Sequence, residues 1–213
     1  MKIQAWFRAS MRRCSSNIPG GGQYGNGASD LPSLLNDGVA KYINLKTFPA
    51  AFVVDGQTYS FIVLTPQFKT YPSVADVETF VNYAKSKYRI DSTRVYMSGI
   101  SIGGEVVGDV AATYPKQVAA IVPISGESQI QSNCTLLAQN KIPIWDFHNS
   151  GDPTINISES MNFIAWVNAA NPAIPPKQTI FQSSEHDAWS TALSPTYNAN
   201  GVNVYEWMLG YSK

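Results

Sequence analysis

The sequence predicts an α/β protein whose sheet is mostly parallel and is covered by helices on both faces. Short apolar runs recur along the chain without interleaved polar residues, which is typical of strands buried on both faces. Segments with apolar residues at helical spacing lie between these runs. The 213 residues allow one sizeable core, so we expect one domain of this class.

The first half of the chain is expected to begin with a glycine-rich loop at residues 19–27. A helix is predicted from Leu31 to Asn44, where apolar residues recur at helical spacing. Asp55-Gly56 stands between two β-prone runs and suggests a small hairpin at residues 51–60. The continuous apolar run at residues 61–65 predicts a buried strand.

The second half alternates helices and strands more regularly. Ser73 is a favourable N-cap for a helix that ends near Lys87. The predicted elements follow in order: a helix at residues 73–87, a strand at 94–98, a helix at 104–114, a strand at 119–124, a polar connection at 125–141, a strand at 143–148, a helix at 157–169, a strand at 177–181 and a closing helix at 202–209.

The most informative motif is the pentapeptide Gly99-Ile100-Ser101-Ile102-Gly103, which joins a predicted strand to a predicted helix. This context is typical of a nucleophile elbow, in which a sharp turn lifts the serine hydroxyl clear of the sheet. The turn leaves no room for side chains at the two glycines. The helix N-terminus lies beneath any negative charge that forms at the serine. The pattern therefore predicts Ser101 as a catalytic nucleophile.

A serine hydroxyl needs a base to take its proton, and the chain contains two histidines. His186 lies in a polar loop after the last predicted strand, at the edge where ligands bind in parallel sheets. His148 lies at a predicted strand end and is expected to be a buried, hydrogen-bonded residue that supports the next loop. We therefore predict His186 as the base.

The base needs an acidic residue to orient it and to stabilise its charged form. Asp152 directly follows a predicted strand, and the proline after it stiffens the loop. Asp187 is the rival acid, but a residue adjacent to the base points elsewhere on a tight loop. The resulting order of Ser101, Asp152 and His186 is the chain order of α/β-hydrolases.

The oxyanion that forms during acyl transfer needs backbone N–H donors. One donor is expected from Ile102, directly after the nucleophile. The other is expected from the glycine-rich loop, with Gly21 preferred and Gly22 next. A phosphate-binding loop is the alternative interpretation, but neither Gly-Lys-Ser/Thr nor a G-x-G-x-x-G motif followed by a helix is present.

These motifs together resemble the small α/β-hydrolase esterases related to polyhydroxybutyrate depolymerases, feruloyl and acetylxylan esterases, and the phospholipase/carboxylesterase group. The resemblance implies the α/β-hydrolase fold and assigns the triad to Ser101, Asp152 and His186. It extends from about Gly20 to Leu209 on these stretches: residues 20–27, 65–68, 99–104, 121–126, 147–148, 151–153 and 186–189.

The N-terminal part departs from the pattern of this family. The family usually has His-Gly after an apolar strand at the oxyanion loop, whereas Pro19-Gly20 stands here after the polar and basic residues 8–18. These residues are not expected to form the usual central strand. We therefore expect a fold reduced at its N-terminal strands, with an atypical segment at 1–18 before a catalytic domain at 19–213. The strand at 61–65 or its neighbour would then be an exposed edge, covered by the N-terminal segment or a second copy, or left beside a disordered tail.

The triad and the resemblance predict a serine carboxylesterase that forms an acyl-enzyme and uses no metal or organic cofactor. Small or short-acyl esters are expected, because the connection at 125–141 holds no amphipathic helix long enough to act as a lid. Gly22, Tyr24 and Trp189 are expected to contact the substrate. A feruloyl- or acetylxylan-type carbohydrate esterase is one alternative, and a weakly active or inactive binding protein with the same fold is another.

Composition argues against several kinds of partner. Fifteen Lys and Arg balance 15 Asp and Glu, so neither nucleic acid nor an anionic membrane is expected as a partner. No apolar run is long enough for a membrane span, and the N-terminus lacks the apolar stretch of a signal peptide. We expect a cytoplasmic monomer or homodimer, unless a longer native form is secreted. Cys14 and Cys134 fit no metal or redox spacing and are expected to remain free thiols.

Overall fold

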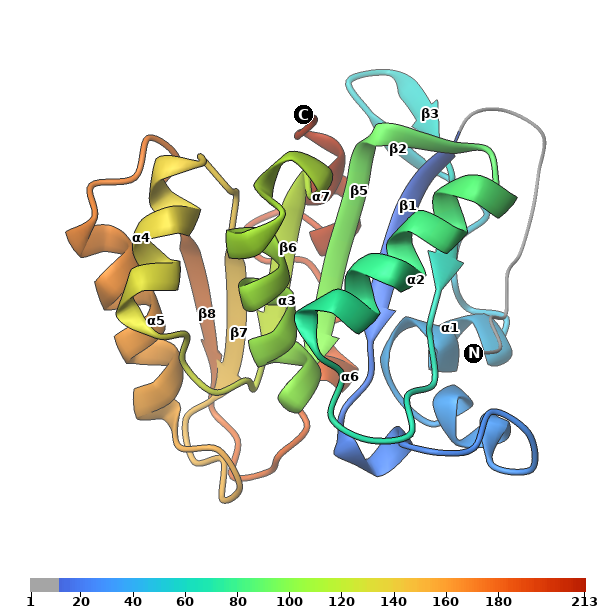
Figure 1. Cartoon of the computed structure of the whole chain (residues 1–213), viewed down its shortest axis with the longest axis horizontal. Helices are drawn as coiled ribbons and strands as arrows, with labels where there is room; N and C mark the ends of the chain where they lie inside the picture. The colour runs from blue at the N-terminus through green and yellow to red at the C-terminus, as the bar shows by residue number, and fades with distance from the viewer. Residues whose placement is uncertain (1–11) are drawn as a thin grey trace.

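The computed structural model describes residues 12–213 as a six-stranded parallel sheet flanked by helices (Figure 1). The strand order is β4-β1-β5-β6-β7-β8, and a separate hairpin pairs β2 with β3. The strands are β1 (Arg12–Ile18), β2 (Phe52–Val54), β3 (Gln57–Tyr59), β4 (Phe61–Leu64), β5 (Ile90–Ile100), β6 (Ala120–Ile124), β7 (Trp145–Asn149) and β8 (Lys177–Phe181). The α-helices are α1 (Gly38–Asn44), α2 (Val74–Lys87), α3 (Ile102–Thr113), α4 (Gln131–Gln139), α5 (Ile157–Ala169), α6 (Trp189–Ala192) and α7 (Val204–Leu209). Short 3-10 helices are η1 (Gly21–Gln23), η2 (Leu31–Leu35) and η3 (Pro115–Gln117).

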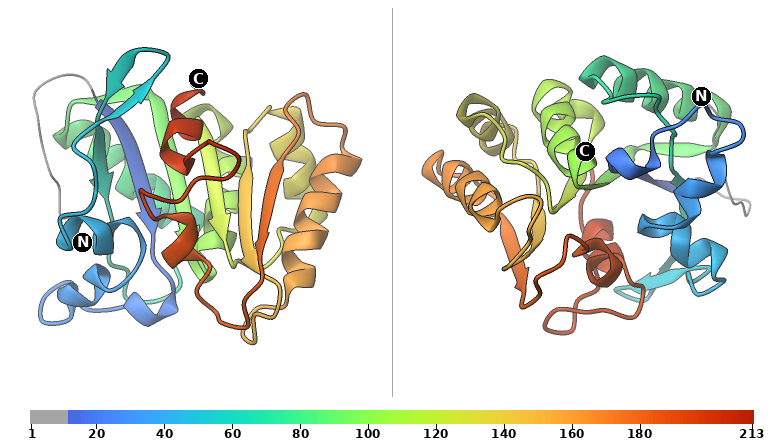
Figure 2. Two further views of the ribbon diagram at one scale, coloured as in Figure 1. Left: turned by 180° about the vertical axis from the view of Figure 1, so that it is seen from behind. Right: turned by 90° about the horizontal axis from the view of Figure 1, so that it is seen from below.

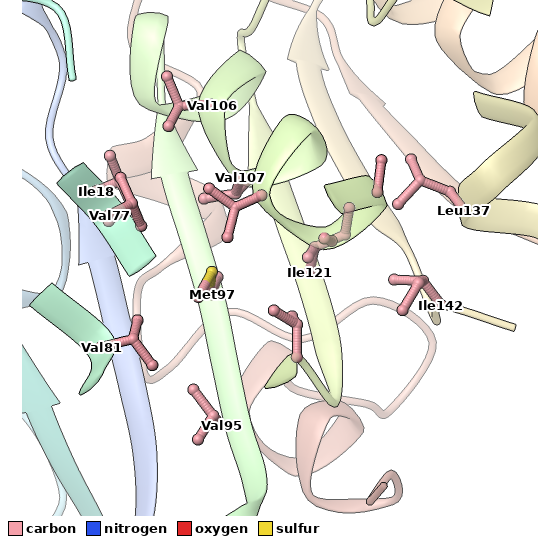
Figure 3. Close-up of a cluster of buried hydrophobic side chains, with 14 of the residues drawn as sticks. Ile18, Val77, Val81, Val95, Met97, Val106, Val107, Ile121, Leu137 and Ile142 are labelled. Atoms are coloured by element: carbon pink, nitrogen blue, oxygen red, sulfur yellow. The ribbon is translucent and has the colours of Figure 1, made fainter. Parts of the chain in front are cut away.

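Helices cover both faces of the sheet, as the sequence predicts. Helices α2 to α5 lie on one face, and α1, α6 and α7 lie on the other (Figures 1 and 2). Successive residues of β5 serve the two faces in turn, because strand side chains alternate: Met97 belongs to the first core cluster and Tyr96 to the second. Figure 3 shows part of the first cluster, where Met97 and Ile121 of the sheet lie near Val107 of α3. Strands β4, β6 and β7 and the second half of β5 are thus buried on both sides, whereas β8 is partly exposed.

The N-terminal expectation is wrong for residues 12–18, which form the interior strand β1. This strand pairs in parallel with β4 on one side and β5 on the other. Ser15, Ser16 and Asn17 are buried within it. Backbone pairing does not require apolar side chains, and these side chains are small. Asn17 Oδ1 also accepts a hydrogen bond from Ser98 Oγ at 3.0 Å, so its polar group has a partner.

Strand β4 forms one edge of the sheet and β8 the other, so the strand expected at residues 61–65 does lie at an edge. Its inner side pairs with β1, and all four of its residues are buried. The cover expected for this edge depends on apolar residues within 1–11, which lie outside the described residues.

The single helix expected over residues 31–44 is divided into η2 and α1. Gly38 interrupts it with a φ of +61°, a left-handed conformation that glycine adopts without a steric penalty. A Cβ at this position would lie 2.4 Å from the side-chain nitrogen of Asn17, so the backbone packs closely here. The apolar spacing continues across the break, which is why periodicity alone does not reveal it.

The polar connection expected at residues 125–141 contains helix α4, which the sequence interpretation missed. Cys134, Leu137 and Ala138 form its buried side, and the helix packs on α3 and α5. Only a narrow stripe of its nine residues is apolar, so the segment resembles a loop in sequence. The helix covers a face of the sheet.

Other predicted elements are confirmed. Asp55-Gly56 forms the turn of the β2–β3 hairpin, and α2 begins with a capping box between Ser73 and Asp76. Cys14 and Cys134 are both buried free thiols. Within residues 12–213, no helix is long and apolar enough to cross a bilayer.

Candidate active site

The carboxyl ends of four parallel strands carry the predicted site residues. Ser101 follows β5, Asp152 follows β7, His186 follows β8, and the glycine-rich loop follows β1. Because these strands run parallel, all four loops emerge at one edge of the sheet (Figure 1, lower side). This is the edge at which open α/β sheets bind their ligands.

The turn at Ser101 has the strained geometry of a nucleophile elbow. Ser101 has a φ of +54°, a value that non-glycine residues seldom adopt. Its amide donates a hydrogen bond to the carbonyl of Ile124 at 2.8 Å, which holds the turn against β6. A Cβ on Gly99 would lie 1.9 Å from the carbonyl oxygen of Gly103, and one on Gly103 would lie 2.3 Å from that of Ile18. Both positions therefore require glycine.

A chain of hydrogen bonds joins the three side chains predicted as the triad. Ser101 Oγ donates to His186 Nε2 at 2.9 Å, and His186 Nδ1 donates to Asp152 Oδ2 at 2.7 Å. The side chain of Asp152 is fully buried, whereas that of His186 is 19% exposed. The carboxylate of Asp152 is therefore shielded from water, whereas the imidazole of His186 remains accessible.

Asp152 is held in place by the backbone of its own loop. Its second carboxylate oxygen, Oδ1, accepts hydrogen bonds from the amides of Thr154 at 2.9 Å and Ile155 at 3.0 Å. Burial by itself raises the pKa of Asp152, but the hydrogen bonds from His186 and these two amides outweigh it and leave the pKa below its ordinary value. The carboxyl group is therefore kept ionised beside the imidazole.

The two alternative residues lie outside this chain of hydrogen bonds. His148 is fully buried, and its Nε2 donates to the carbonyl of Ile155 at 2.9 Å, so it supports the loop between β7 and α5 that carries Asp152 (the acid loop), as expected. Burial lowers its pKa, which favours the neutral ring. Asp187 Oδ1 accepts from the amide of Ser190 at 3.1 Å, at the start of α6.

The acid loop and the histidine loop are joined directly, a feature that the sequence interpretation missed. Asn149 Nδ2 at the end of β7 donates to the carbonyl of Glu185 at 2.7 Å. The amide of Gly151 donates to the carbonyl of Ser183 at 2.9 Å. The sequence signal available for Asn149 is a buried polar residue at a strand end, three positions before the acid. These bonds set the distance between Asp152 and His186.

The glycine-rich loop packs against the elbow. A Cβ on Gly20 would lie 3.3 Å from Cβ of Ser101, and one on Gly21 would lie 3.3 Å from the side chain of Ile102. Gly21 begins η1 and Ile102 begins α3. Amides at the first position of a helix have no partner within that helix, so both are available to a ligand.

Gln67 anchors this loop, a role that the sequence analysis did not assign to it. Its buried side chain donates from Nε2 to the carbonyl of Gln23 at 3.1 Å and accepts at Oε1 from the amide of Gly27 at 2.9 Å. A Cβ on Gly25 would lie 2.4 Å from its amide nitrogen. Gln67 follows the end of β4, so it links the loop to the edge strand.

The residues expected to contact the substrate lie on both sides of the serine. The rings of Trp189 and His186 meet edge to face, with centroids 5.0 Å apart. Gly22 is exposed, and a Cβ there would have no atom within 4 Å. The hydroxyl of Tyr24 is buried without a partner among the described residues. Burial, followed by the charge of Glu105, raises its pKa, so the protonated hydroxyl is a donor for a ligand.

This arrangement suits nucleophilic acyl transfer. A serine hydroxyl contacts the imidazole, a buried carboxylate orients that imidazole, and the glycine-rich loop packs against the serine. Among residues 12–213, no three His, Cys, Asp or Glu side chains are grouped as metal ligands.

Comparisons with known proteins find similarity to families of ester hydrolases. The model of the phospholipase/carboxylesterase family matches residues 62–198. A bifunctional acetylxylan esterase/xylanase of Neocallimastix patriciarum is 27% identical in an alignment over 113 residues that covers 49% of this chain and 16% of that protein. A probable acetylxylan esterase A of Aspergillus terreus is 25% identical over 181 residues, covering 73% of this chain and 54% of the relative. The chain thus spans about half or less of the length of these relatives.

The fold also has solved counterparts. A thermostable esterase superimposes with a TM-score of 0.69 at 19% sequence identity, over 95% of this chain and 56% of its own. At this identity the likeness shows the α/β-hydrolase fold alone.

Proposed function

Because the chain belongs to the phospholipase/carboxylesterase family, we propose that it is a serine carboxylesterase that acts on small or short-acyl esters. The observation that carries this proposal is the hydrogen-bonded chain from Ser101 Oγ through His186 to Asp152. A serine bonded to a neutral imidazole, which is oriented by an ionised carboxylate, is the arrangement that activates an alcohol for attack on an ester.

In the proposed reaction, Ser101 Oγ attacks the ester carbonyl carbon while His186 Nε2 takes the hydroxyl proton. The tetrahedral intermediate carries its negative charge on the former carbonyl oxygen, and the amides of Gly21 and Ile102 donate to it. His186 then gives its proton to the departing alcohol, which leaves an acyl ester on Ser101. Water attacks this ester with His186 as base, and the acid is released. Asp152 stabilises the imidazolium at each step.

The preference for small esters is supported by the surroundings of the serine. Helix α4 packs on α3 and α5, so the connection at 125–141 supplies no covering helix for a long acyl tail. The Trp189 ring lies against His186, where it provides a short apolar contact rather than a channel. We expect activity on p-nitrophenyl esters to be highest for acetate to butyrate. A maximum at decanoate or longer would contradict this preference.

The direct test of the proposal is the replacement Ser101→Ala. We expect ester hydrolysis to fall by about 10⁴-fold or more, because the nucleophile is lost. A fluorophosphonate probe should label the wild-type protein and not this variant, and unfolding curves should show that both are folded. Ser150→Ala is the matched control, since its hydroxyl lies in the acid loop outside the hydrogen-bonded chain. A folded wild-type protein that neither labels nor hydrolyses esters would instead be a binding protein with this fold.

A carbohydrate esterase that removes acetyl groups from xylan is the second candidate. It is favoured by the relatives named as acetylxylan esterases, which align with up to 73% of this chain. Release of acetate from acetylated xylan, compared with p-nitrophenyl acetate under the same conditions, separates it from a general esterase. A large preference for the polysaccharide would select the second candidate.

A further inference from the structure

We propose that Asp37 is a positioning residue that holds two loops of the active site in register. One is the oxyanion loop, residues 19–24, and the other is the histidine loop, residues 183–189. The inference rests on the proposed function, because it assigns the reason why the oxyanion donors and the base stay correctly placed relative to each other.

The carboxylate of Asp37 contacts one side chain from each loop. Gln23 Nε2 donates to Oδ2 at 2.5 Å, and the indole Nε1 of Trp189 donates to Oδ1 at 3.0 Å. Each oxygen therefore serves a different loop. A single rigid carboxylate fixes the separation of the two donors, since its oxygens cannot move independently.

The backbone around Asp37 directs the side chain toward these loops. Asp37 is the N-cap residue of α1, and aspartate normally accepts an amide hydrogen bond at this position. Here its side chain makes no capping bond. The left-handed Gly38 follows and packs on Asn17, which fixes the backbone at this turn. The usual capping hydrogen bond is thus absent, and both carboxylate oxygens of Asp37 instead accept hydrogen bonds from the two active-site loops.

At the first end, Gln23 lies next to the proposed oxyanion donor. A Cβ on Gly20 would lie 3.4 Å from Gln23 Oε1 and 3.3 Å from Ser101 Cβ. Only the backbone at Gly20 therefore separates the side chain of Gln23 from Ser101. The backbone N–H of Gln23 also donates to the carbonyl of Gly20 at 3.1 Å. A displacement of Gln23 would therefore move the loop that carries Gly21.

At the second end, Trp189 lies against the base. Its ring meets that of His186 edge to face at 5.0 Å. Helix α1 strengthens the connection, because Lys41 Nζ donates to Ser190 Oγ at 3.1 Å and the Tyr42 hydroxyl donates to the carbonyl of Ser190. Asp37 thus stands at the start of a helix that braces the segment immediately after His186.

The energetic reason for such a link is preorganisation. Oxyanion donors and a base contribute to rate only when they are already placed for the transition state. A misplacement of about 1 Å can cost about 100-fold. We therefore expect Asp37→Ala to lower kcat by about 10- to 100-fold while KM changes less than about threefold. Asp76→Ala is the control: it also removes an aspartate at a helix start, but in the capping box of α2, so it should lower stability and leave kcat unchanged.

An exchange of donor and acceptor tests the hydrogen bond itself. Gln23→Glu alone places two carboxylates against each other and should lower kcat by about 10-fold or more. Combining it with Asp37→Asn reverses the polarity of the bond: the asparagine NH₂ donates to the carboxylate introduced at position 23, and its oxygen still accepts from Trp189. We expect the double variant to be at least about fivefold more active than the Gln23→Glu variant. A double variant no more active than this single variant, or an Asp37→Ala variant with kcat within about twofold of wild type, would overturn the proposal.

Two further measurements separate this inference from the proposed function. Trp189→Phe keeps the aromatic ring but lacks the N–H donor, and should lower the rate of fluorophosphonate labelling by a few fold. The indole N–H resonance of Trp189 should shift in Asp37→Ala, whether or not the protein hydrolyses esters. An unlabelled wild-type protein would contradict the proposed function, whereas equal labelling rates of wild type and Asp37→Ala would contradict only the role of Asp37. An unshifted indole resonance would also contradict that role.

Discussion

Replacing Asp152 with asparagine isolates the control that the acid exerts on His186, because the charge is lost while the side chain keeps nearly the same size. Asp152 Oδ1 accepts two backbone N–H groups, at 2.9 and 3.0 Å. In the variant, the asparagine oxygen must occupy this place, since its NH₂ group would face two donors. The NH₂ group then points at His186 Nδ1 and donates to it.

This reversal moves the imidazole proton to the wrong nitrogen. When Nδ1 accepts a hydrogen bond, the neutral ring carries its proton on Nε2, which lies 2.9 Å from Ser101 Oγ. A protonated Nε2 cannot take the serine proton. The equivalent change in the serine protease triad costs about 10⁴-fold in kcat. At about 1.4 kcal/mol per factor of ten, this corresponds to about 5.5 kcal/mol of activation free energy.

We therefore expect Asp152→Asn to lower kcat for p-nitrophenyl acetate by about 10⁴-fold at neutral pH. Asp187→Asn is the matched control, because that carboxylate bonds the amide of Ser190, and its kcat should stay within about threefold of wild type. Thermal unfolding of both variants checks that they are folded. An Asp152→Asn variant that is folded and keeps more than a tenth of wild-type kcat would refute the argument from the tautomer.

Two further predictions concern stability. Gly103→Ala should lower the free energy of unfolding, measured by urea denaturation, by about 3 kcal/mol. The reason is that its Cβ would lie 2.3 Å from the backbone oxygen of Ile18, and neither segment can move away. Gly22→Ala is the control and should have no such effect, because its Cβ would have no atom within 4 Å. Burial raises the pKa of Asp146 from 3.8 to about 7 against the opposing hydrogen bonds from Ser160 and Gln178, so the folded state favours the protonated form. The contribution of Asp146 to stability is therefore fully present below about pH 4 and is lost as pH rises to about 7. Asp146→Asn should remove this slope from urea midpoints measured across that range, and an unchanged slope would contradict the assignment.

The candidate triad could be predicted from the sequence because each of its members depends on local chain geometry. The glycines at 99 and 103 permit a turn that few other residues allow, and the strand before and the helix after them are both visible as apolar patterns. Asp152 and His186 each follow a strand that periodicity identifies. In a parallel sheet, the topology then brings all such strand ends to one edge.

Strand β1 and helix α4 could not be predicted in this way. Ser15, Ser16 and Asn17 are polar, yet they lie between β4 and β5 because neighbouring strands supply the backbone hydrogen bonds. Helix α4 contributes only a narrow apolar stripe to a core that is built mainly by the strands and the other helices of that face. In both segments the favourable free energy comes from partners distant in the sequence, so local composition carries little information about it.

By itself, the sequence determined the α/β class, the position of the elbow and the three residues proposed for catalysis, since turn chemistry and hydrophobic periodicity are properties of short segments. Only the tertiary structure decided how the surrounding loops are joined. Asp37 and Trp189 are separated by 152 positions, and Gln67 reaches back 44 positions to Gln23. Such hydrogen bonds start from polar side chains that no period or motif singles out in the sequence, because the distance between donor and acceptor is set by the packing of the whole sheet.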